Sequence, residues 1–199
     1  MCGIVCYVGT KQAKPILLNG LKQLEYRGYD SAGIAIQRGT QVVRYRSVGK
    51  IEELEKKLHN VALPGTTGIA HTRWATHGEP NEENAHPHTD PDEKVFVIHN
   101  GIIENFHSIK KRLEKDGVIF RSETDTEVLA HLIALNFDGD LAEAVRRTMA
   151  QVEGTFGIAV LHKNVPGQIV VARRGSPLII GVGDDGHFAA SDVSAMVRY

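Results

Sequence analysis

Short apolar runs and amphipathic segments alternate along the chain, and each pattern predicts one kind of element. Residues 4–8 and 95–99 are short continuous apolar runs, which are typical of buried strands. Residues 13–27 carry apolar side chains three or four positions apart, the spacing of a helix with one buried face. The same reasoning predicts further strands at 32–37, 41–46, 68–72, 156–161, 168–172, 178–182 and 187–190. Further helices are expected at 51–59 and after residues 105, 124 and 140.

The order of these elements favours antiparallel sheets. Arg38-Gly39-Thr40 separates two strand-like runs as a hairpin turn does. After Thr155, strand-like runs follow one another about every ten residues. Strand pairs followed by helices and then by more strands indicate an α+β protein, not alternating βαβ units. A length of 199 residues suits one large domain.

Capping signals mark three of the expected helix starts. Thr124 and Glu127 have the spacing of a capping box, and Asp140 and Glu143 repeat it. Asn105 is a candidate N-cap for the helix that follows it. We therefore expect these side chains to bind backbone groups in the first helical turns.

Composition excludes several classes of function. The net charge of −1 gives no electrostatic reason to expect nucleic acid or an anionic membrane as a partner. No apolar run is long enough to cross a bilayer, and the N-terminal residues do not form a signal-peptide pattern. These features predict a cytoplasmic protein.

The two cysteines, Cys2 and Cys6, are not expected to form a disulfide with each other. On one strand they would lie about 13 Å apart, whereas a disulfide needs Cα atoms within about 7 Å. Cys6 is interpreted as a small buried residue of that strand.

Cys2 is the candidate nucleophile. If Met1 is removed, Cys2 carries both a thiol and a free α-amine, whose pKa of about 7.7–8.0 makes it a suitable base for that thiol. A nucleophile activated by a terminal amine is an established catalytic solution. Taken alone, Met1-Cys2 is better interpreted as the start of a strand, and only the rest of the chain favours the nucleophile.

Asn100-Gly101 is the candidate oxyanion hole. Asn-Gly between strands is usually a hairpin turn, but here the next residues lead into a predicted helix. The Asn100 amide and the Gly101 N–H are two adjacent donors of the kind that stabilise the oxyanion of acyl transfer.

Residues 73–92 form a long polar stretch without periodicity, which is uncommon in a compact domain unless it is functional. Arg73 is suited to bidentate capture of a carboxylate, and Trp74 offers an apolar lid. A structural Trp packed over an Arg stem explains the same pair equally well. Asp125 is either an acidic residue near a helix N-terminus or the partner of a substrate ammonium group.

The many histidines do not indicate a metal site. The spacings of His71, His77, His86, His88 and His99 match no ligand pattern, and successive side chains of His86-Pro87-His88 would point alternate ways in an extended segment. We expect hydrogen bonds that brace the core or the loops.

Taken together, these segments resemble the class II glutamine amidotransferases, which use an N-terminal nucleophile. The resemblance runs nearly end to end. Within the family, the sequence of residues 27–33 resembles that of the glutamine:fructose-6-phosphate aminotransferases. Amidophosphoribosyltransferases share the chemistry but differ in that segment. The motifs that carry the resemblance are residues 1–4, 26–33, 71–80, 84–88, 99–105, 122–127 and 173–177.

The resemblance implies a four-layer αββα sandwich of two antiparallel sheets between helix layers. It also implies roles: Cys2 is nucleophile and, through its amine, base, while Asn100 and Gly101 form the oxyanion hole. L-Glutamine is the implied substrate, and no cofactor or metal is implied. The implied substrate-binding residues are Arg73 for the α-carboxylate, Asp125 for the α-ammonium, and Thr76, His77 and Trp74 to complete and cover the pocket.

The resemblance also implies a larger protein. Residues 1–199 are expected to be a glutaminase domain that a C-terminal sugar-phosphate isomerase region would follow, and fructose 6-phosphate would bind only there. The full-length enzyme is expected to be a homo-oligomer. Two alternatives stay open, namely another amidase or acylase with an N-terminal Cys, or a non-catalytic glutamine-binding remnant. Cys6 stands where the family pattern leads us to expect Gly or Ala.

Overall fold

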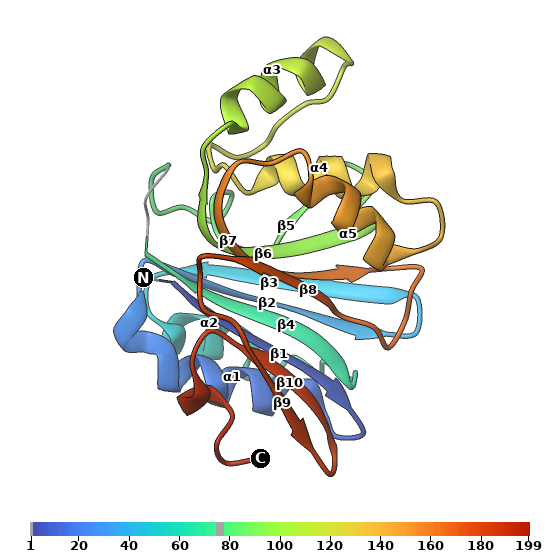
Figure 1. Ribbon diagram of the computed structural model, residues 1–199. Helices are drawn as coiled ribbons and strands as arrows, with labels where there is room; N and C mark the ends of the chain where they lie inside the picture. Colours follow the sequence, from blue (N-terminus) through green and yellow to red (C-terminus); the bar gives the residue numbers. More distant parts are fainter. Residues whose placement is uncertain (1, 75–77) are drawn as a thin grey trace.

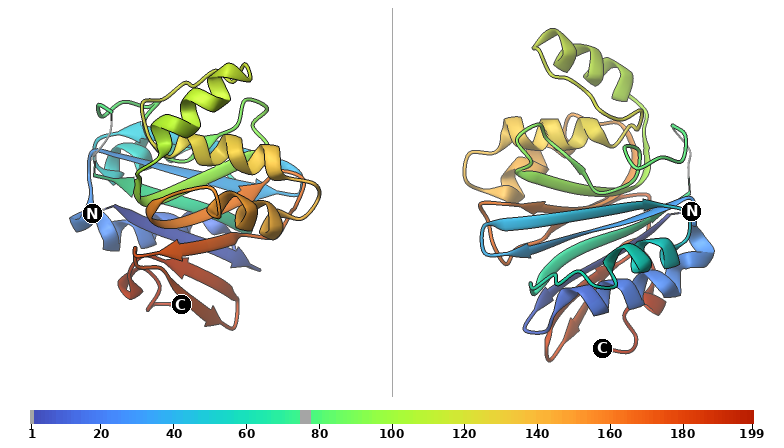
Figure 2. Two further views of the ribbon diagram at one scale, coloured as in Figure 1. Left: turned by 45° about the horizontal axis from the view of Figure 1, so that its top comes forward. Right: turned by 180° about the vertical axis from the view of Figure 1, so that it is seen from behind.

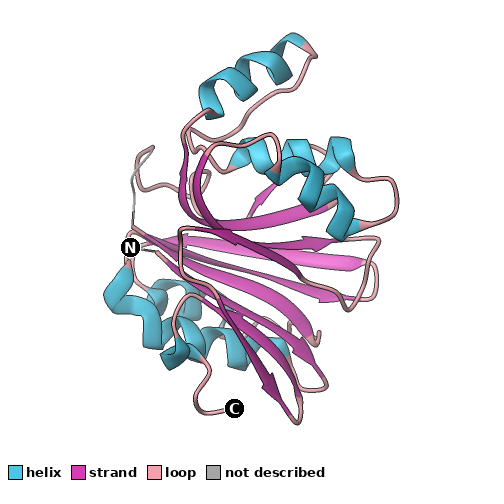
Figure 3. Cartoon of the chain, in the orientation of Figure 1, coloured by secondary structure: helices cyan, strands magenta, loops and turns pink. Residues whose placement is uncertain are grey.

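Two antiparallel sheets lie face to face between two layers of helices in the computed structural model, which describes residues 2–74 and 78–199 (Figures 1 and 3). The strands are β1 (Gly3–Gly9), β2 (Ser31–Arg38), β3 (Gln41–Val48), β4 (Thr67–Arg73), β5 (His88–Thr89), β6 (Val95–Ile103), β7 (Gly154–His162), β8 (Val170–Arg174), β9 (Ile179–Gly183) and β10 (Gly186–Ala190). The α-helices are α1 (Ala13–Leu24), α2 (Ile51–Leu58), α3 (Phe106–Lys115), α4 (Glu127–Asn136) and α5 (Leu141–Met149). This arrangement confirms the expected αββα sandwich.

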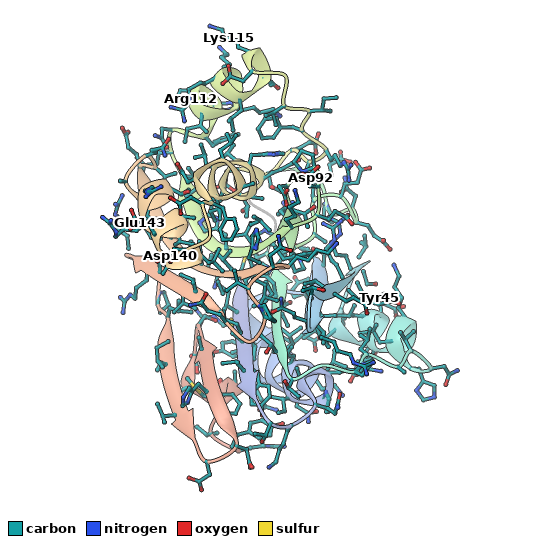
Figure 4. All side chains as sticks on the ribbon, turned by 90° about the vertical axis from the view of Figure 1, so that its right-hand side faces the viewer. Tyr45, Asp92, Arg112, Lys115, Asp140 and Glu143 are labelled. Atoms are coloured by element: carbon teal, nitrogen blue, oxygen red, sulfur yellow. The ribbon has the colours of Figure 1, made fainter. Side chains whose placement is uncertain are left out.

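The six-stranded sheet has the order β3-β2-β4-β1-β10-β9, and the four-stranded sheet has the order β5-β6-β7-β8. All pairings between named strands are antiparallel. Helices α1 and α2 cover the outer face of the larger sheet, and α4 and α5 cover that of the smaller one (Figures 1 and 2). Helix α3 stands farther out, and its Arg112 and Lys115 project from the molecule (Figure 4).

Period-two alternation in the strands explains why three apolar layers form. On β1, Ile4 and Cys6 face the space between the sheets, whereas Val5 and Tyr7 face α1. On β6, Phe96 and Ile98 meet them from the smaller sheet, and Val95 and Val97 face the other helix layer. Cys6 is buried and both cysteines are free thiols, as expected.

The structure corrects two predicted element boundaries. Strand β6 does not stop at His99 but continues to Ile103, paired with β7 throughout. Helix α4 begins at Glu127, and Thr126, not Thr124, occupies its N-cap position. The Glu127 carboxylate instead accepts hydrogen bonds from Arg121 N (2.8 Å) and Ser122 N (2.6 Å), so it organises the loop before the helix.

The other two capping signals have different outcomes. Asp140 caps α5, because its Oδ1 accepts the Glu143 N–H at 3.0 Å, and the two side chains lie together in Figure 4. Asn105 occupies the N-cap position of α3, but its side chain binds Gln151 O and Glu153 N across the chain (both 3.0 Å). None of the described helices is both long enough and apolar enough to span a bilayer.

Candidate active site

Six of the eight predicted site residues line one cavity of about 310 Å³: Cys2, Arg73, Trp74, Asn100, Gly101 and Asp125. The cavity lies where β1 begins and where β4 and β6 end. Figure 1 shows these strand ends on one side of the sandwich. Thr76 and His77 lie outside the described residues, as does Met1. Residues far apart in the sequence therefore meet at one site.

Cys2 is held at the start of β1 by the end of β4. Its Sγ accepts the Trp74 N–H at 3.2 Å and lies 3.5 Å from Trp74 O. Ser191 holds β1 at Ile4, two residues after Cys2. Its Oγ accepts a hydrogen bond from Ile4 N at 3.0 Å, and its N–H donates to Ile4 O at 3.1 Å. The thiol consequently has a defined place at the cavity wall.

Burial raises the pKa of the Cys2 thiol, and the Trp74 N–H and the nearby Arg73 guanidinium only partly oppose this effect. The site therefore keeps the thiol protonated near neutral pH. A catalytic use of this thiol requires a base.

Asn100 reaches Cys2 from the opposite sheet. Its Nδ2 donates to Cys2 O at 3.1 Å, and its Oδ1 lies 3.0 Å from His71 Nε2. Asn100 and Cys2 thus share a direct contact across the two sheets. An amide donor this close to a nucleophile is the arrangement that oxyanion stabilisation needs.

Gly101 exposes its N–H along the open edge of β6. His99 N donates to His86 Nδ1 (3.2 Å) and Ile103 N donates to Asp125 Oδ2 (2.8 Å), so alternate residues of β6 direct their N–H groups away from β7. Strand alternation directs the Gly101 N–H to the same edge, between these two occupied donors. Gly101 also lines the cavity, which places a second donor beside Asn100.

Arg73 and Asp125 provide opposite charges at the same cavity. Both side chains are buried, and Arg73 Nη2 donates to Gly78 O at 3.2 Å. Burial lowers the pKa of Arg73, and the charges of Cys2, Asp30 and Asp125 oppose that shift. The pair can neutralise a bound zwitterion without leaving either ion unpaired in a buried place.

Residues 26–33, which lead into β2, received no individual role from the sequence, and the structure gives them one. A Cβ at Gly28 would lie 2.7 Å from the Arg73 carbonyl carbon, and a Cβ at Gly33 would lie 2.0 Å from His86 O. The two glycines therefore let the chain approach the site-forming segments closely. Tyr29 contacts the half-exposed Trp74 edge-on, with ring centroids 5.6 Å apart.

Several other lining residues received no individual role from the sequence. All of them except Thr155 fall within the motifs, but a lone Thr, Ser or His has no chemical signature that sets it apart. They are Arg27, His86, His99, Ile102, Thr124, Thr126, Thr155, Ser176 and Pro177.

The histidines near the cavity are buried and neutral. Burial lowers the pKa of His71 and His88 to about 3, and it also lowers those of His86 and His99. The rings of His86 and His88 lie next to each other, with 4.7 Å between their centroids and an interplanar angle of 71°. Within residues 2–74 and 78–199, no three His, Cys, Asp or Glu side chains are grouped to hold a metal ion.

Known proteins match this chain along its whole length. The glutamine–fructose-6-phosphate aminotransferase (isomerizing) of Aquifex aeolicus is 52% identical over 199 residues, and that of Pyrococcus horikoshii is 50% identical over 201 residues. Each alignment covers all of this chain and 34% of the relative. The chain thus spans about one third of the length of these curated relatives.

Solved structures and a family model agree with these relatives. Glutamine phosphoribosylpyrophosphate amidotransferase from B. subtilis superimposes with a TM-score of 0.86 at 28% identity, over 98% of this chain and 42% of that one. A class-II glutamine aminotransferase domain protein from Silicibacter pomeroyi (TM-score 0.65, 18% identity, 96% of this chain and 88% of that one) shares the fold. The family model for the glutamine amidotransferase domain matches residues 71–198. The chain therefore belongs to the glutamine amidotransferase domain family.

Proposed function

We propose that this chain hydrolyses L-glutamine to glutamate and ammonia through a γ-glutamyl thioester on Cys2. The observation that carries the proposal is one cavity that joins the Cys2 thiol, the Asn100-Gly101 donors and the Arg73 and Asp125 charges. A nucleophile, an oxyanion site and a zwitterion clamp are the three parts that glutamine hydrolysis by acyl transfer needs.

The reaction begins at the Cys2 thiol. With Met1 removed, the α-amine of Cys2 takes the thiol proton, and the sulfur attacks the side-chain carboxamide carbon of glutamine. Asn100 Nδ2 and the Gly101 N–H donate to the oxygen, which becomes negative in the tetrahedral intermediate. The ammonium returns a proton to the amide nitrogen, and the C–N bond breaks to release ammonia. A water molecule, deprotonated by the same amine, then hydrolyses the thioester to glutamate.

Two charged residues of the cavity are proposed to set the substrate preference. Arg73 binds the α-carboxylate and Asp125 the α-ammonium, with Thr76 and His77 completing the pocket and Trp74 covering it. A simple amide or a peptide lacks one or both of the charged groups that Arg73 and Asp125 would bind, which disfavours its binding. The site is thereby matched to a free amino acid.

The ammonia has a proposed destination in the complete protein. The names of the relatives support a transfer to fructose 6-phosphate that yields glucosamine 6-phosphate, with the sugar phosphate bound by a C-terminal sugar-phosphate isomerase region. The full-length protein is proposed to be a cytoplasmic homo-oligomer. No cofactor enters the glutaminase reaction proposed for residues 1–199.

Glutamate production from L-glutamine tests the glutaminase directly. Protein whose N-terminal residue is Cys2, verified by intact mass, should release glutamate and ammonia in equal amounts. Cys2→Ala should abolish turnover, because no other group at the site can form the thioester. Wild-type protein that binds glutamine without releasing glutamate would instead identify a non-catalytic binding domain.

Arg73→Ala separates a glutaminase from a general amidase. Loss of the bidentate contact should raise the KM for glutamine by roughly 10- to 100-fold, since a charged hydrogen bond contributes about 1.5–3 kcal/mol. Arg112→Ala on the exposed α3 serves as the control for the loss of one arginine. Unchanged glutamine hydrolysis by Arg73→Ala would point to an N-terminal-Cys amidase that does not read the α-carboxylate.

A further inference from the structure

His71 is a buried histidine of β4 that touches the candidate oxyanion hole without lining the cavity. Its Nε2 lies 3.0 Å from Asn100 Oδ1 and 3.1 Å from His99 O. Asn100 in turn donates from Nδ2 to Cys2 O at 3.1 Å. A continuous hydrogen-bonded chain therefore runs from His71 through the Asn100 amide to the nucleophilic residue.

Two backbone carbonyls fix the direction of this chain. His99 O can only accept a hydrogen bond, so His71 Nε2 must carry a proton. Cys2 O can only accept as well, so the Asn100 atom that faces it must be the amide nitrogen. The Asn100 oxygen then faces His71, where the Nε2 proton meets it. A flipped amide would set oxygen against oxygen at Cys2 and N–H against N–H at His71.

Burial keeps His71 in a single protonation state. It lowers the pKa of His71 to about 3, so the ring is neutral at neutral pH and carries one proton. Its Nδ1 is buried and has no hydrogen-bond partner among the described residues. The single proton is therefore the one on Nε2, which lies close to two acceptors, His99 O and Asn100 Oδ1.

His71 and His86 bind the backbone at an edge of β6 where no strand pairs with it. β5 pairs with β6 only at Phe96 and Val97, so the edge of β6 is open from His99 onward. His86 Nδ1 accepts His99 N at 3.2 Å, and His71 Nε2 donates to His99 O. The two rings stack at 4.1 Å with an interplanar angle of 12°. Two side chains thus satisfy the N–H and the carbonyl of His99, the residue before Asn100.

We propose that His71, backed by the stacked ring of His86, is a positioning residue that orients the Asn100 amide so that Nδ2 faces the reacting carbonyl. The inference rests on the proposed glutaminase function and deepens it. His71 touches neither the substrate nor the sulfur and acts only through Asn100. Without its N–H, Asn100 Oδ1 would be a buried acceptor with no donor, and the amide would lose its preferred orientation.

Four variants test this role in the protein with Met1 removed: His71→Leu, His71→Gln, Asn100→Ala and the double variant His71→Leu/Asn100→Ala. His71→Leu should lower kcat by roughly 10- to 100-fold, less than the loss of a whole oxyanion donor, which costs about 10²–10³. The KM for glutamine should stay within about threefold, because Asn100 strengthens its contact in the transition state. His71→Gln keeps an N–H donor near the Nε2 position and should recover most of kcat.

The double variant distinguishes positioning from general damage. If His71 acts through Asn100, adding His71→Leu to Asn100→Ala should lower kcat by less than about twofold, whereas independent effects would multiply. His162→Leu is the matched control, since His162 is a buried histidine at the other end of β7, paired with Val95. It should leave kcat unchanged.

A ¹⁵N spectrum of the His71 ring in the wild-type protein gives a readout independent of activity and of the folding of the variants. Between pH 6 and 8 it should show a protonated Nε2, a bare Nδ1 and no titration. A proton on Nδ1, a charged ring, an unchanged kcat in His71→Leu, or an equal loss in the Asn100→Ala background would overturn the proposal. Wild-type protein that releases no glutamate would refute the glutaminase function itself, which is a separate result.

Discussion

At the level of single residues, the Cys2 thiol is positioned by the fold but is not ionised by it. A thiolate stabilised by the fold would need a lowered pKa, yet burial raises the pKa of this thiol. The Trp74 N–H holds Sγ in place at 3.2 Å but does not reverse the shift. The fold positions the candidate nucleophile, whose activation would require a base, and the α-amine of Cys2 is the proposed base.

The need for this base predicts the pH dependence of glutamine hydrolysis. The amine must be neutral to accept the thiol proton, so kcat/KM should rise with pH and level off above a pKa of about 7.7–8.0, the usual range of an α-amine. Initial rates of glutamate formation from pH 5.5 to 9.5 measure the profile. A rate that kept rising toward pH 9.5 would indicate direct ionisation of the buried thiol instead.

Asp125 illustrates a residue whose two sequence interpretations were both incomplete. Helix α4 begins at Glu127 with Thr126 at its N-cap, so Asp125 is not a first-turn residue. Its Oδ2 binds Ile103 N at 2.8 Å and thereby ties the end of β6 to the segment before α4. The carboxylate that is proposed to bind the substrate ammonium therefore also binds the Ile103 N–H. No pattern in the neighbouring sequence predicts this contact.

At the level of elements, β6 is the strand that organises the site. Asn100-Gly101 is neither a hairpin turn nor a strand end, because pairing with β7 continues to Ile103 opposite Gly154. Gly101 has a φ of +131°, and a Cβ there would lie 2.1 Å from Thr155 O. The strand therefore passes through the candidate oxyanion hole only because residue 101 has no side chain.

Gly101→Ala should destabilise the protein as well as impair turnover. The unfavourable φ costs about 1–3 kcal/mol, and the clash with Thr155 O adds to it by forcing β6 from β7. Urea denaturation should show a loss of more than about 3 kcal/mol in the free energy of unfolding. Gly139→Ala is the matched control, since Gly139 has a φ of +115° with no heavy atom within 4 Å. Equal losses in both variants would show that the clash contributes nothing.

The stretch that carries His86 and His88 is fastened by β3. Arg46 Nη1 donates to Glu83 O (3.0 Å) and Ala85 O (3.1 Å), and Arg44 Nη1 donates to Pro87 O at 3.1 Å. The two arginines lie two residues apart on one face of β3. The polar loop is thus ordered by side chains of the larger sheet, which explains how a segment without periodicity keeps two histidines in the interior.

At the level of the whole molecule, the space between the sheets has two chemically different ends. One end is apolar and contains Ile69, Phe96 and Leu161 among others. The other end, beside the cavity, contains the neutral ring of His71, with the ring of His86 stacked on it. Neutral imidazoles satisfy backbone groups there at a smaller desolvation cost than charged side chains.

The buried histidines make the fold sensitive to acid. The unfolded chain takes up a proton at each histidine near pH 6.5, whereas burial holds the pKa of His71 and His88 at about 3 in the folded state. Stability is therefore fully present above about pH 6.5 and is lost as the pH falls below it. Each of these two histidines should remove on the order of 1 kcal/mol by pH 5.5.

Urea denaturation at pH 7.5 and at pH 5.5 measures this loss. His88→Gln should reduce the difference in the free energy of unfolding between the two pH values by roughly 1 kcal/mol, because one titrating group is removed from the unfolded state. A difference that stays the same in His88→Gln would show that this histidine does not contribute to the acid sensitivity.

The sequence by itself determined the class of fold and the individual chemistry of the site. Hydrophobic periodicity is a local property, so the β2–β3 hairpin, α1 and α5 with its Asp140 cap agree with their predicted positions. The motifs also marked Cys2, Asn100-Gly101, Arg73 and Asp125, which the structure brings to one cavity. Local spacing could carry this information because each of these residues has a chemistry of its own.

Only the tertiary structure decided how far β6 extends and what its open edge binds. Both depend on partners distant in the chain, since Gly154 pairs with Ile103, and His71 and His86 flank the peptide of His99. A lone buried histidine carries no signal of its role until the carbonyl it faces is known. Contacts between sheets, not patterns along a strand, therefore set the direction of the Asn100 amide.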